Sequence, residues 1–580
     1  MILPQRKVAI DTETTGLNPY RKTTHVILTQ LWDCEGNSEV CKIPQEVPHQ
    51  VIKDLGDPEV LTLWWNARFD IPLLQKMGLM VRGPFIDVML MARMCCPEEM
   101  AFSLKHFSRK FLDDSYHEEI LLKKYIKKHK INVNQRGFQD VPDHLLLPYG
   151  HKDAKNTYEL FVFLSAAMNE FKLWPHLHHE MALMRRVVMP MESIGILADP
   201  KFASELLIEG QAELRILKAR ICKAVGNPKF NANSNPQVVK AIYNEDHPPT
   251  RYSKQTGNPS ADTLALLQLG TPLALDLIKF RKVSKAVSTY LLNINKALDD
   301  NNVFRVSFNQ LGARTGRWSS SGYEVKGQLQ NQPSTRSKGV LGQIRNIFIA
   351  RPGGRLVFGD LDQVEMRLMA HALNDKEMIE AIHQGKDLHS LACVRLLDKD
   401  PEDKKFRYIA KQLNFVGSYG ASPSKFIEVV QKSTDGEITL DYQLAADAIN
   451  NYREMMTPLR DMCDAMIAET GGITTFYDNF IPVSSSKVHA GPNYYIQGTA
   501  ARLLKLMALD MEVLLRGSDI LMILQVHDEL GFDVPTSNRH LLPQMKSVMT
   551  DLDTFKVPIT SSWAVAKRWG SKKDIKLTKV

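Results

Sequence analysis

The chain has 580 residues, which implies several packed domains, and its 44% hydrophobic and 24% charged residues are an ordinary globular composition. The formal net charge of +8 fits a polyanionic partner, although many proteins are mildly basic. The seven cysteines form no C-x-x-C pair and no apolar run approaches the roughly 18 residues of a membrane span, so we expect a cytoplasmic protein with neither a zinc site nor a disulfide framework.

Strand-like and helical runs are mixed in the first stretch, to about residue 180. Strands are predicted at 7–14 and 26–32, and apolar residues at helical spacing predict a helix at 154–171. This mixture indicates an α/β domain.

The rest of the chain is expected to be mostly helical at first, from about 181 to 300, around a polar, loop-rich insert. Strands return at 303–310 and 355–362 and, after a second helical block, at 521–534. Strands so far apart in the sequence predict one sheet that carries a large helical insertion.

Asp11 and Glu13 form the first group of candidate site residues. They lie two residues apart at the end of a predicted strand, so their carboxylates point to the same face. Two adjacent carboxylates repel each other, and such a pair suits Mg²⁺ or Mn²⁺. Taken alone, the D-x-E pattern is equally consistent with surface charge.

Two later segments strengthen the interpretation of a metal site. Asn66, Phe69 and Asp70 form N-x-x-F-D, and Tyr149 and Asp153 lie one helical turn apart. The ordered motifs resemble the DnaQ-like 3′→5′ exonuclease module, which has an RNase H-like fold. The resemblance implies two metal ions held by Asp11, Glu13, Asp70 and Asp153, an attacking water oriented by Tyr149, and substrate contacts from Asn66 and Phe69.

Two other charged features of this region have simpler interpretations. Asp87 is expected to be structural. The run KKYIKKHK, with lysines at 123, 124, 127, 128 and 130, is consistent with a guide for single-stranded DNA and equally with a solvated helix face.

A second pair of carboxylates comes from distant segments. Asp360 follows a predicted strand, and Asp528 lies at the tip of a predicted hairpin. An acid at a strand end paired with an acid at a distant hairpin turn is typical of a polymerase palm.

The helical block between these acids carries Arg407, Lys411, Phe415 and Tyr419, four residues apart. The first three share one helix face and Tyr419 lies at its edge. A face with two cations and then aromatic rings suits a triphosphate followed by a sugar and a base, whereas a core stripe would not include arginine and lysine.

Seven ordered motifs in this half resemble family A DNA polymerases of the DNA polymerase I type: TGRWSSS (315–321), LQNQP (329–333), GDLDQVEMR (359–367), GKDLHSLA (385–392), RYIAKQLNF (407–415), NYYIQGTAARLLK (493–505) and QVHDE (525–529). The resemblance implies an exonuclease domain at 1–180 and a right-hand polymerase domain at 181–580. Its thumb would span about 185–305, its palm about 306–385 and 506–580, and its fingers about 386–505. Because no room for a 5′-nuclease lies ahead of Asp11, the chain is expected to resemble the Klenow portion of such enzymes alone.

The resemblance also implies roles for individual residues. Asp360 and Asp528 would bind two Mg²⁺ ions; Arg407, Lys411 and His389 would bind the triphosphate. Glu365 matches the steric gate against a ribose 2′-hydroxyl; Phe415 would pack on the incoming sugar and base, where phenylalanine goes with rejection of dideoxynucleotides, and Tyr419 would lie beside the templating base. Arg317, Asn493 and Gln497 match residues that touch primer–template, and Gln363 and His527 are further expected substrate contacts.

Several positions depart from the family pattern. Leu361 and Asp362 replace the usual Tyr and Ser, Val416 replaces Gly, His489 replaces Arg, and residues 323–327 form a small insertion. We expect a monomer that binds primer–template DNA and dNTPs in replication, in the host cytoplasm if it is encoded by a bacteriophage. A single-subunit RNA polymerase, and a nuclease whose inactive polymerase half binds DNA, are the alternatives.

Overall fold

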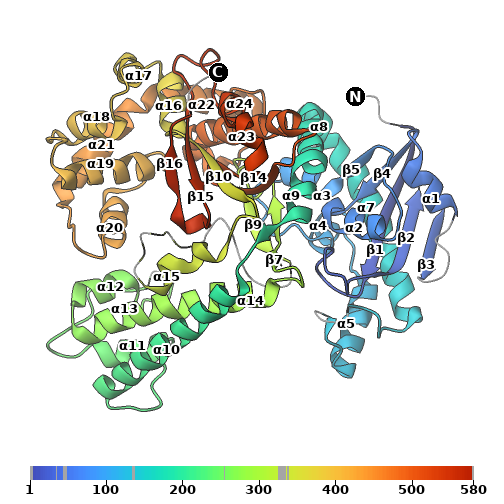
Figure 1. Ribbon diagram of the computed structural model, residues 1–580, viewed down its shortest axis with the longest axis horizontal. Helices are drawn as coiled ribbons and strands as arrows, with labels where there is room; N and C mark the ends of the chain where they lie inside the picture. The colour runs from blue at the N-terminus through green and yellow to red at the C-terminus, as the bar shows by residue number, and fades with distance from the viewer. Residues whose placement is uncertain are drawn as a thin grey trace.

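The computed structural model describes residues 4–33, 35–42, 49–133, 137–253, 255–323, 333, 335, 337 and 339–577 (Figure 1). Most of the predicted LQNQP motif and of the insertion at 323–327 lies outside the described residues. The buried apolar residues form two large clusters, one mostly before residue 185 and one from Leu183 to Trp569. In the described part of the chain, no helix combines the length and the apolar composition that crossing a bilayer requires.

The N-terminal domain is built on a five-stranded mixed sheet in the order β3-β2-β1-β4-β5. The strands are β1 (Arg6–Thr14), β2 (Val26–Asp33), β3 (Ser38–Lys42), β4 (Val60–Trp64) and β5 (Phe85–Asp87). β1 pairs antiparallel with β2 and parallel with β4, and the predicted strands at 7–14 and 26–32 are confirmed. Central β1 therefore carries its side chains into the middle of the domain.

Helices flank this sheet. They are α1 (His49–Gly56), α2 (Ala67–Lys76), α3 (Val88–Cys95), α4 (Leu104–Phe111), α5 (His117–His129) and α7 (Asp143–Glu170). The carboxylate of Asp87 accepts hydrogen bonds from the backbone N–H groups of Met89 and Leu90, which cap α3, and from those of Asn66 and Ala67. The expected structural role of Asp87 is thereby confirmed.

A helical arm follows the N-terminal domain (green in Figure 1). The leading segment is α8 (Trp174–Leu183), η1 (Met184–Val188), α9 (Met189–Ile194) and β6 (Ile196–Leu197), and the arm is α10 (Pro200–Val225), α11 (Asn235–Ile242), α12 (Thr263–Leu269), α13 (Pro272–Lys285), η2 (Ala286–Leu291) and α14 (Leu292–Ala297). Its longest helix, α10, starts at a favoured N-terminus, where Asp199 accepts the N–H of Phe202 and Pro200 occupies the first turn. The helix ends at Gly226, whose left-handed backbone suits glycine.

The second large sheet has five antiparallel strands in the order β13-β14-β10-β15-β16. Its members are β10 (Gly354–Leu361), β13 (Leu521–Val526), β14 (Glu529–Pro535), β15 (Ser561–Ala566) and β16 (Lys573–Ile575). Around it lie β7 (Val303–Phe304), β8 (Val306–Asn309), β9 (Ser319–Gly322), α15 (Val340–Gln343), η3 (Ile344–Ile347), η5 (Thr536–Leu541), α24 (Leu542–Val548) and η6 (Trp569–Ser571). The central strand β10 comes long before its partners in the chain, as the sequence predicted.

The segment between β10 and β13 is the predicted helical insertion (yellow and orange in Figure 1). It contains α16 (Val364–Leu373), α17 (Lys376–His383), α18 (Leu388–Leu397), α19 (Lys404–Gly417), α20 (Pro423–Ser433), α21 (Tyr442–Met455), α22 (Thr457–Thr470), β11 (Gly472–Thr474), β12 (Phe480–Pro482), η4 (Ser485–Ala490) and α23 (Gly491–Leu515). The long helix α23 is largely buried and joins this insertion to the sheet.

Buried ion pairs join the N-terminal domain to the rest of the chain. Arg68 of α2 lies 2.7 Å from Glu192 of α9, and both side chains are buried. Glu192 also accepts hydrogen bonds from the backbone N–H of Phe308 and from the hydroxyl of Tyr323. Because a buried charge without its partner is costly, these contacts fix how the two parts sit together.

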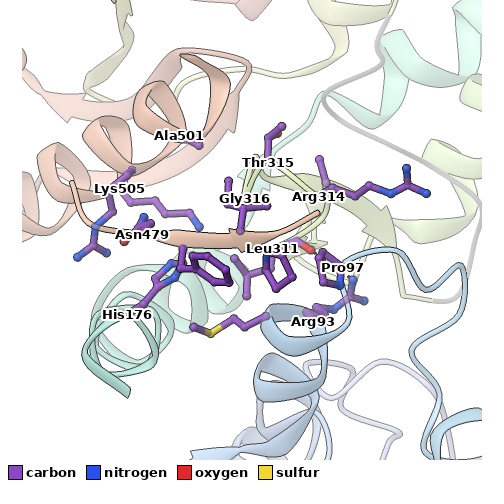
Figure 2. Close-up of a pocket in the computed structure, with 17 residues that line it drawn as sticks. Arg93, Pro97, His176, Leu311, Arg314, Thr315, Gly316, Asn479, Ala501 and Lys505 are labelled. Carbon is purple, nitrogen blue, oxygen red and sulfur yellow. Dashed lines mark hydrogen bonds between the residues drawn. The ribbon is translucent and has the colours of Figure 1, made fainter. Parts of the chain in front are cut away.

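A second junction lies at a small cavity of about 30 Å³ between α3, α8, α23 and the segment before β9 (Figure 2). There Lys505 of α23 lies 2.7 Å from Glu180 of α8, and both are buried. Burial alone would raise the pKa of Glu180, but Lys505 and His176 outweigh it and lower the pKa to about 2. None of the predicted metal-binding carboxylates lines this cavity, so it is a structural junction.

Candidate active sites

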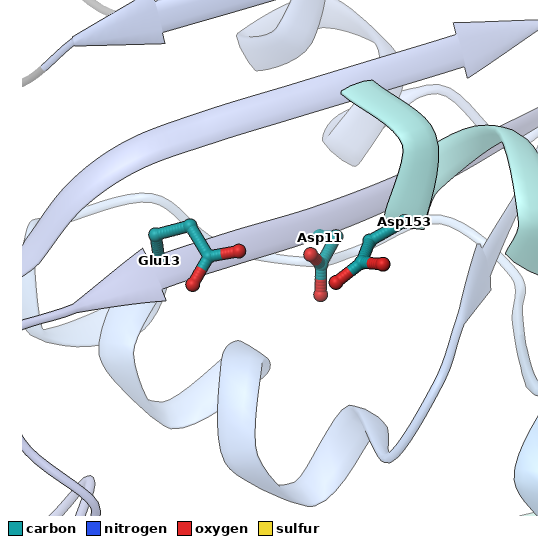
Figure 3. Close-up of side chains that lie close together, drawn as sticks. All are labelled: Asp11, Glu13 and Asp153. Carbon is teal, nitrogen blue, oxygen red and sulfur yellow. The ribbon is translucent and has the colours of Figure 1, made fainter. Parts of the chain in front are cut away.

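The first carboxylate group assembles as the sequence predicted (Figure 3). Asp11 and Glu13 project from β1 to one side, and Asp153 of α7 faces Asp11. One carboxylate oxygen from each lies within 4.8 Å of the other two. This donor set of three hard oxygen ligands suits a divalent cation such as Mg²⁺ or Mn²⁺.

Asp70 and Tyr149 lie beside this group. Asp70, in the first turn of α2, is buried, and its carboxylate accepts a 2.6 Å hydrogen bond from the hydroxyl of Thr12. It is not one of the three clustered carboxylates. Tyr149 lies one turn before Asp153 on α7 and is also buried.

Two residues that the sequence motifs did not indicate complete the site. Lys105, in the first turn of α4, forms an ion pair with Asp153, and its ammonium lies 4.6 Å from the centre of the Tyr149 ring. Tyr116, just before α5, donates a 3.0 Å hydrogen bond from its hydroxyl to Asp153. No recognisable motif surrounds either residue, so only the fold could place them here.

The crowding of acids changes their protonation. Burial, followed by the charge of Asp153, raises the pKa of Asp11 to about 7. Burial and the neighbouring Asp11 also raise the pKa values of Glu13 and Asp70. Burial raises the pKa of Asp153 as well, although Lys105 opposes it. Without a cation the cluster therefore retains protons near neutral pH, and a bound cation would favour the ionised carboxylates instead.

A pH dependence of stability follows from the Asp11 shift. Its pKa is raised from the ordinary 3.8 to about 7, so between those values the metal-free native state binds more protons than the unfolded state, and stability falls as pH rises. We expect the melting temperature in chelator to fall by several degrees from pH 4 to pH 7, and to fall less in Asp11→Asn. Differential scanning fluorimetry of both proteins measures this. Identical pH profiles for the two proteins would contradict it.

The second pair of acids meets on the other sheet. Asp360, at the end of β10, lies opposite Glu529, the first residue of β14, and Asp528 occupies the preceding two-residue turn with His527. Desolvation, then Glu529 and Asp528, raises the pKa of Asp360 to about 7, although its side chain keeps an exposed edge. Adjacent strand pairing thus brings the two predicted metal ligands together.

The departures at Asp362 and Val416 have clear locations. Both oxygens of Asp362 accept hydrogen bonds, one from the Thr560 hydroxyl at 2.7 Å and one from the Ser562 hydroxyl at 2.5 Å. This extra carboxylate is therefore held by the β15 side of the sheet. Val416 is buried, whereas its neighbour Phe415 is 62% exposed, so the two side chains lie on different faces of α19.

A chain of polar side chains links the acids to the helical insertion. Arg317 donates hydrogen bonds to Glu365, in the first turn of α16, and to Asp528, the latter at 3.4 Å. Gln497 of α23 interacts with Glu365 and donates a 2.5 Å hydrogen bond to the Tyr419 hydroxyl. Five predicted residues from separate segments are thus in one connected site.

The predicted cationic face lies on α19. Arg407, Lys411 and Phe415 are all exposed on it, and Arg407 donates a 2.9 Å hydrogen bond to Asp387. His389 lies against this helix through Asn414, whose amide is 3.2 Å from the His389 Nδ1. Two exposed cations and an exposed ring on one helix are a surface that suits a nucleotide.

Tyr419 needs a correction, because it is not on the helix. α19 ends at Gly417, and Tyr419 lies in the turn that follows, with its ring centre 5.6 Å from that of Phe415. The ring of Tyr452 packs on Gly417, where an added Cβ would lie 2.8 Å from it, and Gly420 has a left-handed backbone. Both features favour a helix end, which a four-residue repeat does not reveal.

The remaining predicted contacts are dispersed around the two sites. Asn66 and Phe69 lie at the start of α2, beside Asp70. Asn493 lies one turn before Gln497 on α23, and its buried side-chain oxygen has no hydrogen-bond partner among the residues that the structure describes. Gln363, which precedes α16, and His527 both have left-handed backbones close in sequence to Asp360 and Asp528, the predicted metal ligands.

Comparison with known proteins agrees with this architecture. Residues 201–571 match the family model described as DNA polymerase family A, and residues 2–169 match a 3′-5′ exonuclease model. The chain belongs to DNA polymerase family A. The match is to DNA polymerases, and so the RNA polymerase alternative has no support. The α/β N-terminal exonuclease domain and the right-hand polymerase domain expected from the sequence are confirmed.

Curated relatives of this family A chain are bacterial. It is 28% identical to DNA polymerase I of Chloroflexus aurantiacus over 97% of the chain and 61% of that protein. It is 30% identical to DNA polymerase I of Helicobacter pylori over 67% of the chain and 43% of that protein. The chain therefore spans about half the length of the curated relatives it matches.

A solved structure has the same fold. The POL domain of Pol1 from M. smegmatis, in complex with DNA primer-template and dNTP, superposes with a TM-score of 0.79 at 20% identity, covering 98% of this chain and 97% of that one. The likeness therefore extends over both domains and their arrangement.

Proposed function

We propose that this chain is a template-directed DNA polymerase that extends a primer with dNTPs and removes misincorporated nucleotides with its own 3′→5′ exonuclease. One observation carries the proposal: two separate acidic sites, at Asp11 and at Asp360, lie on different sheets, and a chain of polar side chains links the second site to the end of α19, the helix with the exposed cationic face. Family membership supports the same conclusion. Separate sites for selection and hydrolysis are the logic of editing, because binding alone discriminates too weakly.

The domain boundaries follow from this function. The exonuclease domain would comprise residues 1–180 and the polymerase domain residues 181–580. The α10–α14 arm would be the thumb, the β10 sheet the palm, and the helices inserted between β10 and β13 the fingers. The chain would act as a monomer on primer–template DNA.

The carboxylates fit divalent cations in both sites, two in each. Asp11, Glu13, Asp70 and Asp153 would hold Mg²⁺ or Mn²⁺ in the exonuclease site, and Asp360 and Asp528 in the polymerase site. Such ions supply an activated oxygen nucleophile and neutralise charge on the leaving group. Tyr149, whose pKa burial raises, stays a neutral hydroxyl that orients the attacking water in the exonuclease site.

The α19 face would bind the nucleotide. Arg407, Lys411 and His389 present cationic or polar groups to the triphosphate, where negative charge moves toward the departing pyrophosphate. Phe415 offers an exposed ring to the sugar and base, and Tyr419 lies where the templating base would pass.

The remaining polar residues would hold DNA. Arg317, Asn493 and Gln497 donate to the minor groove, where every base pair presents similar acceptors, so pairing is checked without reading sequence. Gln363 and His527 flank the primer end, and Asn66 and Phe69 hold the displaced 3′ nucleotide.

Primer extension from matched and mismatched 3′ ends tests the proposal. We expect extension from the matched end, and removal of the mismatched nucleotide before extension begins. Incorporation that ignores the template, or a mismatch that is never removed, would contradict the proposal.

Glu365→Ala should weaken discrimination against ribonucleotides. The carboxylate lies between Arg317 and Gln497, and its removal opens space beside the sugar C2′. We expect the rNTP/dNTP ratio of kcat/KM to rise on the order of tenfold to a hundredfold, the usual range for a pocket that loses a steric contact. Single-nucleotide incorporation measures this, with Glu377→Ala in the first turn of α17 as the control. An unchanged ratio would remove Glu365 from the sugar pocket.

A further inference from the structure

Helix α5 is the lysine-rich segment for which the sequence left two interpretations. Only Glu119 and Leu122 of this helix are buried, and they lie on the side that packs against α7. Lys123 pairs with Glu119 at 2.7 Å, and that ion pair belongs to the packed side. Ile126, on the same side, packs against the small core cluster that contains Leu122.

The opposite side of α5 has an unusual composition. At about 100° per residue, six exposed residues share about a third of the circumference. They are His117 at the start of the helix and the five that we call the lysine face: Ile120, Leu121, Lys124, Lys127 and Lys128. Ile120 is 42% and Leu121 40% exposed. Two adjacent aliphatic side chains among three lysines form a surface that can contact both the phosphates and the apolar parts of a nucleic-acid strand.

The position of α5 indicates which partner. Tyr116, the residue before its first turn, donates a hydrogen bond to Asp153 in the exonuclease site. The helix then extends away from that site for about 20 Å, at 1.5 Å per residue. It lies at the lower edge of the N-terminal domain in Figure 1. A strand whose 3′ end is in the site can therefore follow α5.

We propose that the lysine face binds the single-stranded DNA that leads into the exonuclease site. Lys124, Lys127 and Lys128 contact successive phosphates, and Ile120 and Leu121 pack on sugars and bases. No acidic side chain interrupts the face, because Glu118 and Glu119 fall outside its arc. This inference rests on the proposed exonuclease function.

The test compares long and short substrates. The variant Lys124→Gln/Lys127→Gln/Lys128→Gln is assayed for 3′→5′ degradation of a single strand of about 12 nucleotides, a length typical of such surfaces, and of a trinucleotide. Each lost phosphate contact reduces the magnitude of the slope of log affinity against log salt by about 0.7, so three lost contacts reduce it by about 2. At 0.1 M salt, the loss of three phosphate contacts corresponds to about a hundredfold loss of kcat/KM on the long strand.

The trinucleotide should be degraded at the wild-type rate, since it is too short to reach the lysine face. The matched control is Lys22→Gln/Lys53→Gln/Lys172→Gln, which removes three exposed lysines of the same domain from other elements. A long-strand kcat/KM and salt slope equal to those of this control would overturn the inference, as would an equal loss on both substrates. Failure of the exonuclease proposal itself is distinct, because the wild-type chain would then degrade neither substrate.

Discussion

Replacing Asp11 and Glu13 together by alanine should abolish degradation of single-stranded DNA and leave primer extension intact. The two residues supply two of the three clustered carboxylates, and loss of the proposed cation would remove several kcal/mol of transition-state stabilisation. We expect the rate of single-strand degradation to fall by at least about a thousandfold, which corresponds to about 4 kcal/mol in the activation free energy. The rate of digestion of a labelled single strand measures it.

The reciprocal variant is Asp528→Asn, which should abolish extension and spare digestion. Asp528 lies in the turn between β13 and β14, beside Asp360 of β10, whereas Asp11, Glu13 and Asp153 lie on β1 and α7 of the N-terminal domain. Circular dichroism confirms that each variant is folded. A folded variant that loses both activities would show that the two sites are not independent.

Phe415→Tyr should greatly weaken discrimination against dideoxynucleotides. The 3′-hydroxyl of a normal dNTP can hydrogen-bond its own triphosphate and help set the reactive geometry, and a dideoxynucleotide lacks this donor. A tyrosine hydroxyl can replace it, and phenylalanine cannot. A charge-assisted hydrogen bond contributes about 1.5–3 kcal/mol, so the ddNTP/dNTP ratio should rise roughly ten- to a hundredfold.

The buried position of Val416, the residue next to Phe415, supports this prediction. Val416, a branched residue where the family has glycine, is buried away from the exposed Phe415 ring, so it does not compete for the sugar face. Single-nucleotide incorporation in the Asp11→Ala/Glu13→Ala background measures the ratio. A change of less than about twofold, far below one hydrogen bond, would show that Phe415 does not face the sugar.

The sequence predicted the features that depend on local spacing. Strand alternation placed Asp11 and Glu13 on one side of β1, and the four-residue repeat placed Arg407, Lys411 and Phe415 on one face of α19. Both placements follow from the regular backbone geometry of a strand and a helix alone.

Features that depend on tertiary contact were not predictable. Lys105 reaches Asp153 only because α4 packs against α7, and a lysine in a helix otherwise indicates a solvated surface. Arg68 lies inside a predicted motif, yet its partner Glu192 is far along the chain. Tyr419 lies beyond the end of α19, where the ring of Tyr452 packs on Gly417. No pattern within that helix encodes this contact.

The strand order of the sheet around β10 has a consequence for how the molecule folds during synthesis. β10 pairs on one side with β14 and on the other with β15, and both are translated only after all the helices of the insertion. Contacts of such long sequence separation form slowly, because closing the intervening loop costs entropy. The N-terminal domain has its whole sheet within its first ninety or so residues and can fold on emergence. The nascent chain should therefore acquire the ability to degrade DNA before the ability to make it.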